Sequence, residues 1–447
     1  MFKKVLVANR GEIAVRAINT LKEMGIQTVS IYSKADKKSY FVSLADESFC
    51  VGMEKAEESY LNIQNIISVA LLSGCDAIYP GYGFLAENSD FAEICENVGI
   101  KFIGPSADVM RKVGNKLEAL KYVRKLSIPV IPGSLINIDS LQICKKIAKK
   151  VGFPLMLKAS SGGGGKGIRL VNDEKSLAKS YQVVKLETQS SFSNSNIYVE
   201  KLIKPARHIE VQFIKDNYGK YIIFPERDCS LQRNHQKCIE ETPCKFISSY
   251  TRNKVKRYTQ KIIENLDYEN TGTVEYLIDS KQNIYFMEIN ARIQVEHGIT
   301  EELTGINLIK LQIQVGEGEK ILVSQSDILA KKSVIECRIN AEVPNEHFKP
   351  VNGVIKGLNL PTQGPGIRID HCLRIGEVIP IFYDNMLAKI IVNELSRSAA
   401  IKKMNRILNQ FYITGVPTNR EYLLKLLNDS DFINGNYDTD FLNSREK

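Results

Sequence analysis

The chain has 447 residues, of which 43% are hydrophobic and 25% are charged, and its formal net charge is +9 at pH 7. No apolar run approaches the ~20 residues of a membrane span, and the basic start lacks the long apolar run of a secretory signal peptide. The charge is spread without lysine and arginine blocks or interleaved aromatic residues, which argues against nucleic-acid binding. The nine cysteines never show C-x-x-C spacing, so they indicate buried thiols in a reducing cytoplasm rather than zinc or disulfides.

The first part of the chain alternates short apolar strands with an amphipathic helix. The segments are a strand at 4–9, a helix at 11–25, and strands at 27–33, 75–80 and 100–105. Strands joined through helices are typical of a parallel sheet, because a parallel pair needs a crossover connection. We therefore expect residues 1–113 to form a doubly wound α/β domain.

The stretch SSGGGGKGIRL, residues 160–170, places four consecutive glycines before a lysine. A Walker phosphate loop needs Ser or Thr after the lysine, but Gly167 stands there. A dinucleotide fingerprint needs a helix after its glycines, whereas GIRLV predicts a strand. We therefore predict a mobile glycine hairpin. Its surroundings predict a small α+β lid, with helices at 141–152 and 174–187 and strands at 154–160 and 196–202.

Two β-hairpins are predicted next, at 207–228 and 271–290. In the second hairpin Glu275 alternates with apolar neighbours, and polar residues recur at every second position of the returning segment. These residues are Glu288, Asn290, Arg292, Gln294 and Glu296. Oxygen ligands on adjacent strands suit Mg²⁺, but ordinary charge alternation on a solvated strand face explains the same pattern. The alternation ends early if the chain leaves the sheet after Asn290.

Further cations lie near these elements. Lys116 and Lys158 suit phosphate oxygens, although Lys116 taken alone is better explained as a surface helix residue. The segment ERDCSLQRNHQK, residues 226–237, is either a functional loop or a basic surface turn. The histidines match no metal-ligand spacing. From about residue 331 the strand patterns at 332–343 and 383–392 and a closing helical stretch predict a third domain.

Taken together, these segments resemble the ATP-grasp superfamily and, within it, biotin carboxylase over nearly the full length. The matching stretches are ANRGEIAVR, PGYGFLAEN, IGPS, KASSGGGGKGIR, VEKLI, RHIEVQ, ERDCSLQRNHQK, GTVEYL, MEINARIQVEH, ECRINAE and YDNMLAK. ARIQVEH and ERDCSLQRNHQK distinguish this family from other ATP-grasp ligases. The resemblance implies an N-terminal domain at 1–113, an ATP-grasp domain at 114–330 with a lid at about 131–203, and a C-terminal α+β domain at 331–447.

The resemblance also implies the site. ATP would contact Lys116, Lys158, Gly163, Gly164, Gly165, Glu200, Lys201, His208, Gln232, His235, Glu275 and Glu288. Mg²⁺ or Mn²⁺ would be held by Glu275, Glu288 and Asn290. Bicarbonate would be bound by Lys237, Arg292, Gln294, Val295 and Glu296, with Glu296 as the base, and Arg338 would stabilise the biotin enolate. The chain departs from the family at Gly298, where proline is usual, at Ser161 and in FKPVNGVI, but no implied catalytic group is lost.

The implied reaction activates bicarbonate with ATP to carboxyphosphate and then carboxylates biotin, under a lid that excludes water. The chain lacks an AMKM biotin-attachment site, so we expect a separate subunit. The resemblance implies a homodimer, and the cysteine pattern indicates the cytoplasm. Its partners would be a biotin carboxyl carrier protein and carboxyltransferase subunits, with bacterial acetyl-CoA carboxylase and fatty-acid synthesis as the default. Alternatives are another acyl-CoA or small-molecule carboxylase, a different ATP-grasp ligase, and a nucleotide-binding scaffold without turnover.

Overall fold

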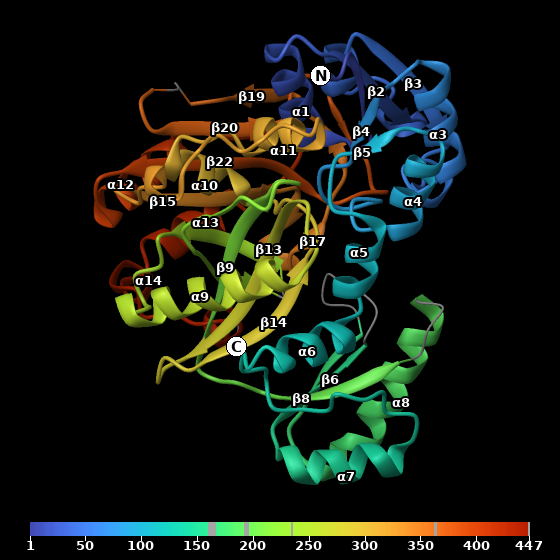
Figure 1. Cartoon of the computed structure of the whole chain (residues 1–447). Helices are drawn as coiled ribbons and strands as arrows, with labels where there is room; N and C mark the ends of the chain where they lie inside the picture. The colour runs from blue at the N-terminus through green and yellow to red at the C-terminus, as the bar shows by residue number, and fades with distance from the viewer. Residues whose placement is uncertain (160–166, 192–195, 234–235, 362–363, 446–447) are drawn as a thin grey trace.

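A computed structural model of the chain describes residues 1–159, 167–191, 196–233, 236–361 and 364–445. Figure 1 shows the N-terminal region (blue) and the C-terminal region (orange and red) above, and a smaller lobe (green) below. None of the described helices has both the length and the apolar character to cross a bilayer. Most thiols are buried, as predicted, whereas Cys50 is exposed and Cys372 is half-buried.

The N-terminal region is a parallel sheet with strand order β3-β2-β1-β4-β5. Its strands are β1 (Lys4–Val7), β2 (Gln27–Ser33), β3 (Glu47–Gly52), β4 (Ala77–Tyr79) and β5 (Lys101–Phe102). Its helices are α1 (Gly11–Glu23), α2 (Tyr40–Leu44), α3 (Ile63–Leu72) and α4 (Ser89–Asn97), with short turns η1 (Lys34–Asp36) and η2 (Ala56–Glu58). The apolar residues of β1 are fully buried, as in a sheet with both faces covered. The predicted doubly wound α/β fold is confirmed.

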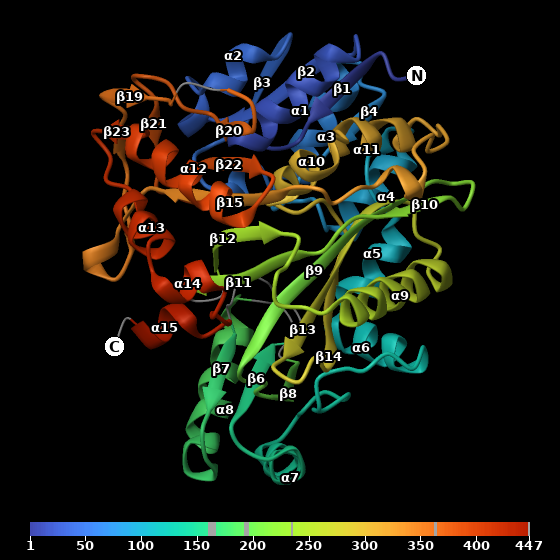
Figure 2. The ribbon, with the colours of Figure 1, turned by 90° about the vertical axis from the view of Figure 1, so that its left-hand side faces the viewer.

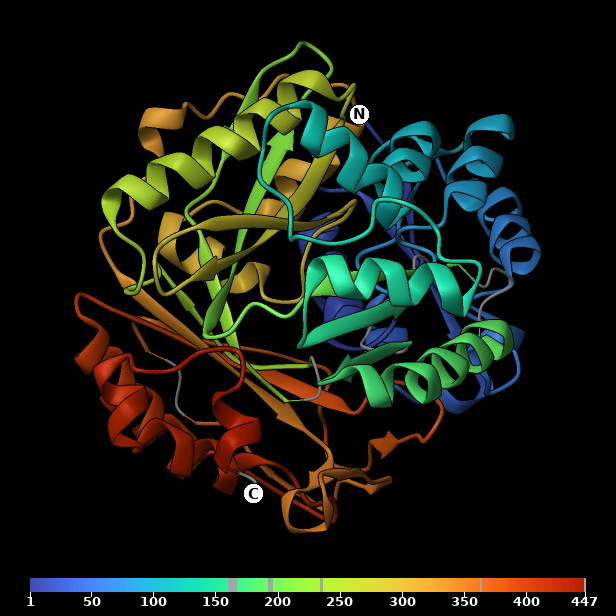
Figure 3. The same cartoon turned by 90° about the horizontal axis from the view of Figure 1, so that it is seen from below.

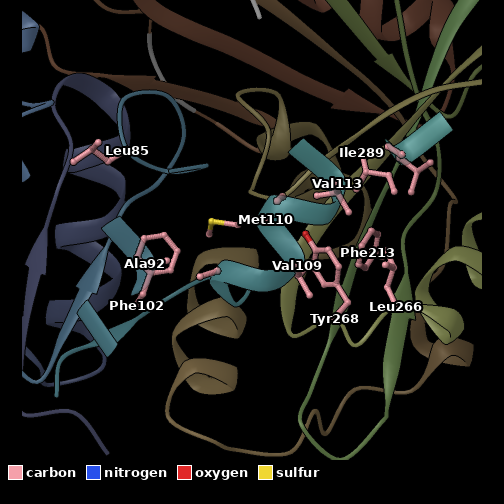
Figure 4. Packing of buried hydrophobic residues seen from close by; sticks show 14 of the residues in the cluster. Leu85, Ala92, Phe102, Val109, Met110, Val113, Phe213, Leu266, Tyr268 and Ile289 are labelled. Carbon is pink, nitrogen blue, oxygen red and sulfur yellow. The ribbon is translucent and has the colours of Figure 1, made fainter. Parts of the chain in front are cut away.

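Helices α5 (Ala107–Gly114) and α6 (Lys116–Lys125) leave this region toward the lower lobe. Val109, Met110 and Val113 of α5 lie in one buried cluster with residues of both neighbouring regions. Figure 4 shows these three side chains between Phe102 on one side and Tyr268 on the other. This packing fixes the N-terminal sheet against the central sheet, so that loops of both can form one site.

The lower lobe contains the predicted lid elements. They are α7 (Leu141–Val151), β6 (Leu155–Ala159), β7 (Ile168–Val171), α8 (Glu174–Ser191) and β8 (Ile197–Lys201). The strands form a small antiparallel sheet in the order β7-β6-β8, and their apolar residues make a core of their own with α7 and α8. Seen from below, the two lid helices lie beside each other (Figure 3). The glycines at 163–165 fall outside the described residues.

The central sheet of the described chain runs in the order β14-β13-β9-β11-β12-β15-β22-β20, with β10 on the edge of β9 (Figure 2). Its strands are β9 (Ala206–Lys215), β10 (Tyr221–Ile223), β11 (Arg227–Arg233), β12 (Gln236–Thr242), β13 (Asn270–Asp279), β14 (Ile284–Asn290), β15 (Ser333–Asn340), β20 (Ile367–His371) and β22 (Met386–Glu394). Both predicted hairpins are present, although the first breaks between β10 and β11. The expectation of a loop or surface turn at 226–237 was wrong for the described part, because β11 and β12 are adjacent buried strands.

The remaining elements surround this sheet. The helices are α9 (Ser249–Asn265), α10 (His297–Thr304), α11 (Leu308–Gly316), α12 (Arg397–Gln410), α13 (Arg420–Leu427), α14 (Ser430–Asn434) and α15 (Phe441–Arg445). The short elements are η3 (Gln325–Asp327), β16 (Glu342–Val343), η4 (Pro344–Glu346), β17 (Lys349–Pro350), β18 (Gly353–Val354), β19 (Gly357–Asn359), β21 (Val378–Ile379) and β23 (Tyr412–Thr414). Because β15, β20 and β22 continue the sheet that contains β9 to β14, the predicted third domain shares its sheet with the segment before it.

Candidate active site

The alternation of β15 divides its side chains between a core and a cavity. Ile335, Cys337 and Ile339 belong to a buried cluster with residues of α12. Arg338 and Asn340 point to the other face, because successive strand residues alternate, and they line a cavity of about 700 Å³. The loop before α1, the loop after β4 and the polar face of β13 and β14 also line this cavity, together with residues 382–386.

The hairpin of β13 and β14 brings oxygen ligands together. Glu275 lies directly opposite Glu288, and Asn290 Nδ2 donates to Glu275 Oε1 at 2.9 Å. Glu275 is only 5% exposed, which contradicts the alternative of a solvated strand face. Glu288 is also 2.9 Å from the ammonium of Lys116, at the start of α6. Two carboxylates and an amide are the donors that Mg²⁺ prefers, so these residues fit that ion.

The chain leaves the sheet after Asn290, where β14 ends. This agrees with the expectation that the alternation ends early if the chain leaves the sheet. The loop nevertheless brings Arg292, Gln294 and Glu296 to the cavity before α10 begins. Gln294 Nε2 donates to Glu275 Oε1 at 3.2 Å, so the loop is tied to the strand that it has left.

A network of buried charges forms the floor of the cavity. The Lys237 ammonium contacts Glu296, and it lies 2.6 Å from Glu210 Oε2 and 3.5 Å from Glu275 Oε1. Arg338 Nη2 lies 2.8 Å from Glu296 Oε2. Glu296 therefore lies between two cations, although its residue is fully buried. Paired in this way, a buried carboxylate can remain charged.

The pKa directions follow from this pairing. Burial alone would raise the pKa of Glu296, but Lys237 and Arg338 lower it well below the ordinary value. Burial is likewise outweighed at Glu275, where Lys237 and His208 lower the pKa. Burial opposes the charged form of His208, yet the Glu275 carboxylate, 2.9 Å from Nε2, raises the pKa of this imidazole. The site therefore holds ionised acids beside cations.

Three family models match consecutive parts of the chain. They are "Biotin carboxylase, N-terminal domain" at residues 1–110, "Carbamoyl-phosphate synthase L chain, ATP binding domain" at 115–323, and "Biotin carboxylase C-terminal domain" at 336–444. Biotin carboxylase 1 of Bacillus subtilis is 45% identical over 443 residues, which are 99% of this chain and 98% of that protein. The chain belongs to the biotin carboxylase family.

Solved structures of this family agree with the fold. The biotin carboxylase domain of Hydrogenobacter thermophilus 2-oxoglutarate carboxylase, a dimer in complex with MgADP, ADP and bicarbonate, matches with a TM-score of 0.97. It is 41% identical, and the match covers 100% of this chain and 98% of that one. Biotin carboxylase of Campylobacter jejuni, in a β-γ-ATP complex, matches with a TM-score of 0.96 and 42% identity over 99% of each chain. The biotin carboxylase resemblance predicted from the motifs is confirmed.

Most of the predicted site residues line one cavity. They are His208, Lys237, Glu275, Glu288, Asn290, Arg292, Gln294, Val295, Glu296 and Arg338. Lys116 adjoins the cavity through Glu288. In the lid, Lys158 lies 2.5 Å from Glu200, whereas the Lys201 ammonium donates to the Phe153 carbonyl.

The other predicted residues stand apart from this set. Lys158, Glu200 and Lys201 of the lid are not among the cavity-lining residues of the described chain. Gln232 lies opposite Lys237 on β11 and is not among the cavity-lining residues of the described chain. Gly163, Gly164, Gly165 and His235 fall outside the described residues. Their predicted roles in ATP binding stay predictions.

Several charged residues of the site were not predicted from the sequence motifs. Glu210, fully buried, contacts both Lys237 and Arg227, and its position on the polar face of β9 was the available signal. Glu87 accepts a hydrogen bond from Arg292 Nε at 2.9 Å. Glu240 lies in β12 together with Lys237 and Glu241, and Lys389 lies within an apolar run of β22, so neither position gave a periodic pattern.

Proposed function

We propose that this chain carboxylates the biotin group of a carrier protein, consuming ATP and bicarbonate and releasing ADP and phosphate. The observation that carries the proposal is the buried Glu296 carboxylate, held between the Lys237 and Arg338 cations beside the Glu275 and Glu288 ligand pair. The H. thermophilus relative, which was solved with MgADP and bicarbonate, supports the same chemistry.

The nucleotide side of the cavity supplies charges for the phosphates. Glu275 and Glu288, with Asn290, would hold Mg²⁺, which when bound neutralises negative charge on the phosphate oxygens. Lys116 and Lys158 are paired here with carboxylates, Glu288 and Glu200 respectively. ATP phosphates carry the same sign of charge as those carboxylates, so they would compete for the two ammonium groups.

The bicarbonate side supplies a base between cations. Lys237 and Arg292 attract the bicarbonate anion, and Glu296, ionised here, takes its proton. Lys237 and Arg338 weaken this base by stabilising its charge. An arriving anion shares those cations and so makes Glu296 more basic. The deprotonated bicarbonate oxygen then attacks the γ-phosphorus of ATP, and ADP leaves, giving carboxyphosphate.

The second step transfers the carboxyl group. Carboxyphosphate breaks at its C–O bond to CO₂ and phosphate, and that phosphate takes the proton of the biotin ureido nitrogen. The nitrogen then attacks CO₂, while Arg338 offsets the negative charge on the ureido oxygen. A closed lid serves this sequence, because carboxyphosphate hydrolyses in water.

We further propose that the chain works as a homodimeric subunit with a biotin carboxyl carrier protein and carboxyltransferase subunits. A dimer is described for the H. thermophilus relative. The assembly proposed first is acetyl-CoA carboxylase. Methylcrotonoyl-CoA carboxylase subunit alpha of rat is 41% identical over 444 residues, so a similar chain also belongs to a carboxylase for another acyl-CoA.

The product itself tests the function. Purified chain, MgATP and labelled bicarbonate are incubated with biotinylated carrier, and label on the carrier is counted before and after avidin treatment of the carrier. We expect label that requires ATP and disappears when avidin covers the biotin. Nucleotide binding without any labelled biotin would support the scaffold alternative instead.

A further inference from the structure

Lys389 is a fully buried lysine at the edge of the active-site floor. It lies on β22, directly opposite Arg338 of β15 on one side and Asp370 of β20 on the other. Paired residues of antiparallel strands project to the same face, so Lys389 shares the cavity-side face of the sheet with Arg338. Apolar residues occupy the opposite face under α12.

The ammonium of Lys389 has three oxygen neighbours from three separate parts of the chain. Nζ lies 3.1 Å from Glu12 Oε1 on α1 and 3.7 Å from Asp370 Oδ2. It also donates a hydrogen bond to the carbonyl oxygen of Val295 at 2.8 Å. Asp370 is already paired with Arg368 at 2.7 Å. The shortest Lys389 contact is therefore to the main chain of the proposed bicarbonate segment.

We propose that Lys389 is a positioning residue for bicarbonate, which it acts on by anchoring the Val295 carbonyl. This inference rests on the proposed function, because that function assigns Gln294, Val295 and Glu296 to bicarbonate. Lys389 itself does not line the cavity, so it acts through the loop and does not touch substrate.

The planarity of the peptide bond links the anchor to the base. The Val295 carbonyl and the Glu296 N–H belong to one rigid unit and point in opposite directions. Fixing the carbonyl toward Lys389 therefore fixes the direction of the Glu296 N–H and of the Glu296 Cα that follows. The Gln294 carbonyl accepts from the His297 N–H at 3.2 Å, so the loop is held at both ends of this unit.

Glu12 adds a connection to the N-terminal sheet. It belongs to the ANRGE segment, and it lines the same cavity as Glu296. The ion pair of Glu12 with Lys389 thus joins α1 to the bicarbonate loop across two regions of the fold. If Lys389 served only to pair with Glu12 and Asp370, its hydrogen bond to the Val295 carbonyl would not be needed.

The test separates positioning from stability by keeping the buried charges balanced. The double variant Lys389→Met with Glu12→Gln removes one cation and one anion together, which avoids leaving an unpaired buried carboxylate. We expect the nucleotide affinity to remain close to that of the wild type. We expect the bicarbonate KM to rise by about 10-fold to 100-fold, which corresponds to the loss of one hydrogen bond from a charged donor. Bicarbonate KM is measured by phosphate release at saturating MgATP.

Lys403→Met is the matched control. Lys403 also donates to a main-chain carbonyl, that of Pro365 at 3.1 Å, but away from the cavity. We expect its bicarbonate KM to remain that of the wild type. A wild-type KM in the double variant would overturn the inference.

Lys389→Arg keeps the inference testable if the double variant does not fold. Arginine preserves the charge for Glu12 and Asp370 but presents its N–H groups in a planar fork with different directions. We expect a raised bicarbonate KM with unchanged nucleotide affinity, whereas a merely structural role for Lys389 predicts a wild-type KM. Wild-type protein without bicarbonate-dependent phosphate release would contradict the proposed function. Active wild-type protein with unaltered KM in the variants would contradict this inference alone.

Discussion

The buried carboxyl of Glu240 gives a stability prediction whose magnitude follows from the structure. Glu240 lies on β12, is fully buried, and contacts Arg338 Nη2 at 2.5 Å. Glu336 of β15 lies directly opposite and is also fully buried. Burial, offset in part by Arg338, raises the pKa of Glu240 from its ordinary 4.5 to about 7. The folded protein therefore binds this proton more tightly than the unfolded chain does.

A raised carboxyl pKa makes the folded state lose stability as pH rises. The stabilisation that the folded state gains from binding a proton at Glu240 is complete below pH 4.5 and is lost between pH 4.5 and pH 7. At about 1.4 kcal/mol for each pKa unit, the loss is at most about 3.5 kcal/mol. Glutamine does not titrate, so Glu240→Gln should gain stability relative to the wild type over this pH range.

Urea unfolding of both proteins at pH 5 and pH 8 measures this difference. We expect the midpoint of Glu240→Gln to exceed the wild-type midpoint by more at pH 8 than at pH 5. Glu241→Gln is the control on the same strand, because Glu241 accepts hydrogen bonds from Arg397 at 2.6 and 2.8 Å. That variant should be destabilised at pH 8. A Glu240→Gln advantage that is equal at both pH values, or that shrinks at pH 8, would refute the reasoning.

Three further substitutions test other parts of the site. Glu288→Gln should lower turnover at least 100-fold through weaker metal binding, because one ligand charge is lost. Wild-type turnover of this variant at ordinary Mg²⁺ concentrations would show that Glu288 is not a metal ligand. Arg338→Ala should leave ATP affinity unchanged in a calorimetric titration while slowing biotin carboxylation about 100-fold, and normal carboxylation would contradict the enolate role. Gly298→Ala places a Cβ 2.4 Å from Ile391 Cδ1, so it should lower stability by about 1–3 kcal/mol, and an unchanged melting temperature would show that Ile391 moves aside freely.

Local patterns in the sequence predicted the elements and much of the polar cluster. The alternation around Glu275 predicted β13, and its polar face is the one that lines the cavity. The same alternation could not show whether that face meets solvent. The loop at 291–296, which directly follows β14, and the separate N-terminal sheet cover it, and the tertiary fold sets the position of both over this face.

The charges beneath the cavity could not be predicted in the same way. Glu240 and Glu336 face each other only because β12 pairs with β15, and strand pairing over that separation is set by the tertiary fold. Lys389 lies in a strand whose central residues are all buried, and a single lysine in such a strand gives no periodic signal of its role. The role proposed for Lys389 depends on its hydrogen bond to the Val295 carbonyl, which is 94 residues away in the chain.

Phosphate release from MgATP by the purified chain tests the central claim most directly. It is measured with and without bicarbonate and with and without free biotin, and Glu296→Ala is the control. Our account predicts release that requires bicarbonate, increases with biotin, and is lost in the Glu296 variant. Release that is indifferent to bicarbonate and biotin would contradict carboxyphosphate chemistry in this site.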